Sequence, residues 1–97
     1  MQKKIYSIVL YSGLGERKGT LSVEFTENSC EGTIYIMGNE NHFTGIPEGE
    51  IWKLSGSLKT GIWNTEYEGY GKFYDDSLSF EILILGSRYK LKGEIMK

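Results

Sequence analysis

The sequence predicts an all-β protein: one small up-and-down barrel of eight antiparallel strands, closed by pairing of the first strand with the last. Apolar and polar residues alternate with a period of two through most of the chain, as in strands with one buried face. Turn residues recur every 8–12 residues and no stretch has a helical period, which is typical of barrels and sandwiches. A two-sheet β-sandwich is therefore the alternative.

The first part of the chain is expected to form five strands. Polar or glycine-rich breaks separate them at 13–19, 27–29, 38–41 and 47–49, where turn chemistry is favoured. Alternation assigns the following inward residues: Tyr6, Ile8 and Leu10 in 4–12; Leu21, Val23 and Phe25 in 20–26; Cys30, Gly32, Ile34 and Ile36 in 30–37; Phe43 and Gly45 in 42–46; Trp52, Leu54, Gly56 and Leu58 in 50–59.

The last three strands are expected at 65–74, 78–85 and 88–96. The middle one has the clearest alternation, and Gly86-Ser87 after it suits a type II′ hairpin with glycine at the first central position. The inward residues are Tyr67, Gly69, Gly71 and Phe73; Leu78, Phe80, Ile82 and Ile84; Tyr89, Leu91, Gly93 and Ile95. These hairpins predict that Phe80 lies between Gly71 and Gly93.

The glycines of the strands fall on the predicted inner face. Glycine inside a strand costs about 0.5–1 kcal/mol relative to alanine, so a repeated pattern needs a reason. We interpret it as the sharp coiling that closes a small barrel, with aromatic rings covering the bare backbone. The alternative is that the glycines leave interior room for a ligand.

Composition indicates one domain, residues 1–97, without disulfides or membrane helices. The net charge of −2 gives no attraction for nucleic acid or an anionic membrane. Cys30 is the single cysteine, and the first apolar run is too short for a signal peptide and has no cleavage-site pattern. We therefore expect a cytoplasmic protein.

Catalysis is not expected. One histidine and one cysteine make neither a metal cluster nor a nucleophile–base pair. The sequence predicts no enzyme, no metal and no cofactor.

The long loops 13–19, 38–41 and 61–64 fall at one end of the meander, and the last of them carries Trp63. Ligands enter small barrels at such a mouth. We therefore predict a non-enzymatic barrel that binds a small apolar or aromatic ligand at this end. The predicted ligand-binding residues are Tyr11, His42, Trp63 and Tyr89, which line the mouth, and Trp52 and Tyr67, which lie deeper or toward the far end.

A second hypothesis is an interaction module. Four apolar or aromatic residues are expected to point outward on neighbouring strands, where such a patch marks an interface. They are Tyr70, Tyr74, Leu83 and Leu85, and they would bind a partner protein or a second copy.

The strand pattern resembles the calycin-like small barrels, which include lipocalins and avidin. Gly61-Ile62-Trp63 spells the G-x-W of those families, although here it falls in a mid-chain loop and not on the first strand. The resemblance implies an up-and-down barrel, and no functional residue is transferred from it.

Overall fold

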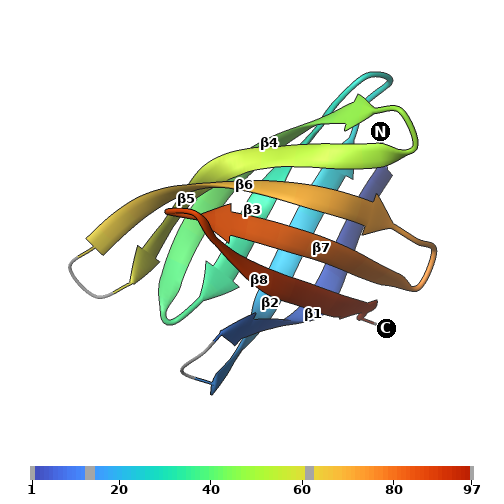
Figure 1. The fold of residues 1–97 in the computed structure, drawn as a ribbon. Coiled ribbons are helices and arrows are strands. Elements are labelled where there is room, and N and C mark those ends of the chain that lie inside the picture. The colour runs from blue at the N-terminus through green and yellow to red at the C-terminus, as the bar shows by residue number, and fades with distance from the viewer. Residues whose placement is uncertain (1, 13–14, 61–62, 97) are drawn as a thin grey trace.

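The strands form one closed barrel in a computed structural model that describes residues 2–12, 15–60 and 63–96 (Figure 1). The strands are β1 (Gln2–Ser12), β2 (Gly15–Phe25), β3 (Cys30–Ile36), β4 (Asn39–Glu48), β5 (Ile51–Thr60), β6 (Trp63–Phe73), β7 (Ser77–Ile84) and β8 (Ser87–Ile95). Each strand pairs antiparallel with the next, and β1 pairs with β8 from Tyr6–Ile95 to Tyr11–Lys90. The predicted eight-stranded up-and-down barrel is confirmed over the sandwich.

The barrel has two unlike ends. The distal end carries the β1–β2, β3–β4, β5–β6 and β7–β8 connections, and it lies on the left in Figure 1. The terminal end carries the other three connections and both ends of the chain. The loops predicted at 13–19 and 61–64 are too long, because β2 begins at Gly15 and β6 begins at Trp63; residues 13–14 and 61–62 are outside the described residues.

Two of the turns differ from the prediction. The β3–β4 connection is Met37-Gly38 and the β7–β8 connection is Leu85-Gly86, and all four residues have positive φ, from 49° to 83°. These are two-residue turns with type I′ signs, so the type II′ turn at Gly86-Ser87 is wrong. The 38–41 loop is wrong too, because β4 begins at Asn39. The left-handed conformation costs a leucine about 1–2 kcal/mol.

The earlier turn shifts the β7–β8 register by two residues. Phe80 lies opposite Gly71 as predicted, but its other partner is Leu91, and Gly93 lies opposite Leu78. A shift of two preserves the face of every side chain. The predicted inner faces therefore survive an error in the predicted pairing.

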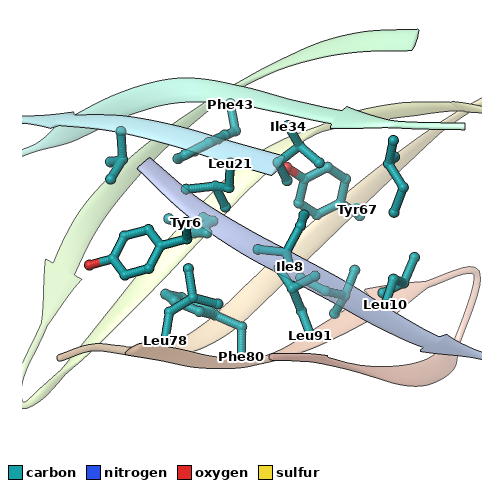
Figure 2. Packing of buried hydrophobic residues seen from close by; sticks show 14 of the residues in the cluster. Tyr6, Ile8, Leu10, Leu21, Ile34, Phe43, Tyr67, Leu78, Phe80 and Leu91 are labelled. Carbon is teal, nitrogen blue, oxygen red and sulfur yellow. The ribbon is translucent and has the colours of Figure 1, made fainter. Parts of the chain in front are cut away.

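Aromatic rings fill the terminal end of the interior. Phe73 lies at their centre, with ring centroids 4.9 Å from Phe80, 5.1 Å from Phe25 and 6.0 Å from Tyr6. Trp52 packs edge-on against Phe25 at 5.6 Å. The distal half is mainly aliphatic (Figure 2). The core is therefore plugged by rings at one end and built from branched side chains at the other.

Gly71 and Gly32 lie where a neighbouring strand and an aromatic ring approach closely, which agrees with the ring coverage of the first interpretation. A Cβ on Gly71 would overlap the carbonyl oxygen of Ser79 and lie 2.6 Å from the Cα of Phe80. A Cβ on Gly32 would overlap the carbonyl oxygen of Ser22 and lie 2.9 Å from the ring of Phe43. The space that these side chains would occupy is already filled by protein.

Candidate functional site

A small enclosed cavity lies in the distal half of the barrel, among the side chains of Figure 2. Its volume is about 10 Å³, which is room for one water-sized group and far below the roughly 300 Å³ of a typical ligand pocket. Six aliphatic side chains and one tyrosine line it: Leu10, Ile34, Ile36, Leu58, Ile82, Leu91 and Tyr67.

Tyr67 is the polar member of this set. It is 4% exposed, and within the described part of the chain its hydroxyl has no hydrogen-bond partner. The other fully buried tyrosine, Tyr6, instead donates to the carbonyl oxygen of Tyr74 at 3.2 Å. An unpaired buried hydroxyl costs about 1–3 kcal/mol. Tyr67 is thus a buried donor whose bonding capacity the described residues leave unused.

Burial also fixes the protonation state of this hydroxyl. Desolvation raises the pKa of Tyr67 well above its ordinary value of 10.0, because an apolar surrounding disfavours the phenolate. The Tyr67 ring lies over its cross-strand neighbour Gly56, and a Cβ on Gly56 would be 3.2 Å from the Tyr67 hydroxyl oxygen. At neutral pH the group is a neutral hydrogen-bond donor held inside the barrel.

Leu58 and Tyr67 belong to a hairpin that projects beyond its neighbours. Backbone pairing of β4 with β5 ends at Phe43–Gly56, and that of β6 with β7 ends at Glu68–Leu83, whereas β5 and β6 pair as far as Thr60–Trp63. We call the described residues 57–60 and 63–67 the β5–β6 arm (left in Figure 1). Two cavity-lining side chains therefore stand just beyond the last backbone pairs of the barrel wall.

Asn41 joins this arm to β4. It is 4% exposed, its Oδ1 accepts from the Lys59 N–H at 2.9 Å, and its Nδ2 donates to the Ile34 carbonyl at 3.1 Å. Asn39 donates to the Lys59 carbonyl at 3.3 Å. Two asparagine side chains thus replace the missing strand ladder. Sequence reasoning assigned both to a turn, although alternation with Phe43 is the signal that places Asn41 inside.

The predicted ligand-binding residues do not form one cluster. Tyr67 lines the cavity and Tyr89 is half-buried against the core. Trp52 packs against Phe25 at the terminal end, far from the predicted mouth. Tyr11 and His42 are exposed on the outer surface, where Thr33 Oγ1 lies 3.2 Å from His42 Nδ1. Trp63 begins β6, and its side chain lies outside the described residues.

The aliphatic residues that line the cavity with Tyr67 had been predicted as core and not as site. The sequence pattern marks Leu10, Leu58 and Leu91 as inward, but it carries no signal for which inward residues border a void. That depends on how the side chains pack.

The four predicted interface residues do not all border the same groove. Leu83 and Leu85 border an outer groove of about 970 Å³, together with Glu66 and Glu68. Tyr74 borders a second groove of about 540 Å³ with Tyr11. These grooves lie on the outside of the barrel.

Tyr70, the fourth interface residue, belongs to a surface cluster on β5 and β6. Its hydroxyl donates to Glu68 Oε2 at 2.9 Å, and Lys53 Nζ lies 3.2 Å from the same oxygen. These two contacts lower the pKa of Glu68, while the carboxylate raises the pKa of Lys53 and that of Tyr70. The cluster is exposed, so it contributes little to stability.

The described residues show no group of three His, Cys, Asp or Glu side chains that could hold a metal ion. Cys30 is 2% exposed and unpaired. Burial raises its pKa to about 11, so the reactive thiolate is scarce at neutral pH. No helix in the described part of the chain could cross a membrane.

The solved structures that share the fold include two redesigned β-barrels. One, mFAP1 bound to DFHBI, has a TM-score of 0.64 at 8% identity, covering 97% of this chain and 93% of its own. The other, b11L5F_LGL, has a TM-score of 0.65 at 10% identity, covering 97% of this chain and 89% of its own. No family model matches the sequence, and a search of curated proteins found no match. At such identities the likeness concerns the fold alone.

Proposed function

We propose that this protein is a non-enzymatic barrel that binds a small, uncharged, largely apolar ligand in the distal half of its interior. The observation that carries the proposal is the Tyr67 hydroxyl, a buried donor without a partner among the described residues, on a ring that lines an aliphatic cavity. Ligand sites combine apolar walls with a few polar groups that fix orientation. A carbonyl or ether oxygen of the ligand would accept a hydrogen bond from this hydroxyl and remove the free-energy cost of leaving it unpaired.

Water is a poor occupant of the cavity. A buried water needs two to four polar partners, and the lining residues offer a single hydroxyl among six aliphatic side chains. An apolar molecule with one acceptor matches this lining better.

A ligand larger than a water requires the distal end to widen. The β5–β6 arm is the part of the wall that can move, because among the described residues it is joined to β4 beyond Phe43 through the side chains of Asn39 and Asn41 and not through a strand ladder. Its displacement would carry Leu58 and Tyr67 outward together. Affinity is then reduced by the cost of opening, and we expect dissociation constants in the millimolar range for small probes.

Two further considerations support the proposal. The barrel mFAP1 has the same fold and is bound to DFHBI, so an eight-stranded barrel of this size can hold a small molecule. The sequence pattern also resembles the calycin-like barrels, such as lipocalins and avidin, and this resemblance implies the same up-and-down architecture. The proposal includes the absence of catalysis and a cytoplasmic location. Cys30, buried and unpaired, is compatible with both, because a buried thiol is unreactive and a reducing compartment keeps thiols free.

Cyclohexanone and methylenecyclohexane test the proposal as matched probes. The two molecules have the same ring, but only the ketone carries an acceptor. Titration followed by methyl NMR is expected to give a Kd about two- to tenfold lower for the ketone, the worth of one hydrogen bond. In Tyr67→Phe the two probes should bind equally. Absence of methyl shifts with either probe in the wild-type protein would contradict the proposal.

Association through the outer surface is a second candidate function. Leu85 favours it: the side chain is 90% exposed and sits at a left-handed position of the β7–β8 turn, where Asn is the preferred residue. Loss of self-association in Leu85→Asn, measured by sedimentation, would support this function. An unchanged sedimentation profile would contradict it.

A further inference from the structure

The β6 edge of the β5–β6 arm is an uncovered strand edge. Residues Asn64–Tyr67 lie beyond the last β6–β7 pair, Glu68–Leu83, and make no backbone pairing on that side within the described residues. The opposite edge of the arm is covered, because Asn39 and Asn41 bond both the N–H and the carbonyl of Lys59. A barrel normally abolishes such edges, and here the projecting hairpin restores one.

A comparison with β2 shows that this edge is also unprotected. β2 projects in the same way, since its pairing with β3 begins at Gly19–Ile36. Its overhanging residues Glu16, Arg17 and Lys18 are consecutive charges, the usual device against edge pairing. Asn64–Tyr67 contains a single charge, at Glu66. Of these two overhangs, only the one on β6 is open to another strand.

The groove next to this edge has a mixed lining, with apolar residues on its β7 side. This groove of about 970 Å³ is lined by polar residues of β4, β5 and β6, by Tyr67 and two glycines, and by two leucines: His42, Lys53, Ser55, Gly56, Ser57, Glu66, Tyr67, Glu68, Leu83, Leu85 and Gly86. Leu85 is the most exposed large apolar residue among those described. A strand placed on the β6 edge would lie along this groove and cover part of Leu85.

The edge residues are complementary to themselves in one antiparallel register. With Thr65 opposite Thr65, each Glu66 faces the Asn64 of the second copy, so an amide meets a carboxylate. A register with Glu66 opposite Glu66 would place like charges together, which is destabilising. The favoured register is two-fold symmetric and closes on itself, as in most homodimers.

From these observations, and resting on the second candidate function above, we propose that two copies of this chain associate by antiparallel pairing of their β6 edges, centred on Thr65. The contact is short, so the dimer is weak and depends on concentration. Its specificity comes from the two symmetric contacts between Asn64 and Glu66.

Substitutions of opposite charge at Asn64 test the register. Asn64→Lys adds two ion pairs with Glu66 and is expected to lower the dimer Kd about three- to tenfold. Asn64→Glu adds two repulsions and should raise it by a similar factor. Asn28, exposed in the β2–β3 turn at the terminal end, provides the control, and Asn28→Lys and Asn28→Glu should leave the Kd unchanged. Sedimentation of the full chain up to about millimolar concentration, where weak contacts of this size are populated, measures each constant.

A cross-link supplies an independent readout. Residues directly opposite in an antiparallel pair have Cα atoms about 4.5–5.5 Å apart, within reach of a disulfide. Thr65→Cys should therefore form a covalent dimer under mild oxidation, and Asn64→Cys should form much less. Cys30 does not compete, because it is 2% exposed.

Three results would overturn the proposal. The first is a wild-type protein that stays monomeric throughout the concentration range. The second is a dimer Kd that changes in the same direction in Asn64→Lys and in Asn64→Glu, and the third is assembly beyond two copies. None of these results depends on whether the interior binds a ligand, so the proposed ligand-binding function is tested separately.

Discussion

Replacing Gly71 by alanine is expected to destabilise this barrel, although the same change stabilises an ordinary strand by about 0.5–1 kcal/mol. The new Cβ would overlap the carbonyl oxygen of Ser79 and stand 2.6 Å from the Cα and 2.8 Å from the Cγ of Phe80. Because two of these atoms are backbone, β6 and β7 must separate. Overpacking costs typically 1–3 kcal/mol, so the net loss should be about 1–2 kcal/mol.

Urea unfolding followed by tryptophan fluorescence measures this loss. A destabilisation of that size lowers the melting temperature of a domain this small by about 4–16 °C. Gly69→Ala is the matched control on the same face of β6, because the one tight contact of its Cβ would be the terminal Ile82 Cδ1 at 2.9 Å, and that methyl can rotate away. The next atoms, Leu54 Cβ at 3.5 Å and the Glu81 carbonyl oxygen at 3.8 Å, are at ordinary contact distances. We expect Gly69→Ala to stay within about 1 kcal/mol of wild type. A Gly71→Ala protein as stable as wild type would refute the close approach of β6 and β7.

Further predictions concern the buried polar groups. Tyr67→Phe should raise the free energy of unfolding by about 1 kcal/mol, since it removes an unpaired buried hydroxyl; a loss of stability in urea would show that the hydroxyl has a partner. Asn41→Ala should lower the free energy of unfolding by about 1–3 kcal/mol. It should also accelerate hydrogen exchange at the Lys59 amide, whose N–H donates to the Asn41 Oδ1; unchanged exchange would mean that this hydrogen bond does not hold the arm. Folding raises the pKa of Cys30 from 9.0 to about 11, so this group's contribution to stability is complete below pH 9 and is lost as the pH rises toward 11. The alkaline loss in the pH dependence of urea midpoints should shrink in Cys30→Ala, and an identical loss in both proteins would contradict this origin.

The strands and their inner faces could be predicted because alternation is a local property. The β7–β8 pairing could not, since Leu85 adopts a left-handed conformation that leucine disfavours, and turn chemistry alone selects Gly86-Ser87. The error placed Phe80 opposite Gly93 instead of Leu91, without changing the face on which its side chain lies. Register thus depends on single turn residues, whereas burial depends on the whole strand.

The candidate site was less predictable than the fold. Tyr67 was predicted correctly as inward, but nothing local distinguishes its unpaired hydroxyl from that of Tyr6, which finds the carbonyl of Tyr74. Tyr11 was assigned to the mouth although alternation with Leu10 already places it on the outer face. Hydrogen-bond satisfaction and cavity position depend on packing between strands distant in sequence, which no single segment encodes.

Intermolecular NOEs between cyclohexanone and isotope-labelled protein locate the ligand most directly. A molecule bound in the distal interior should show contacts to the methyl groups of Leu10, Leu58 and Leu91, and these contacts should weaken in Tyr67→Phe. Contacts only to residues of the outer grooves, such as Leu83, would contradict an interior site anchored by Tyr67.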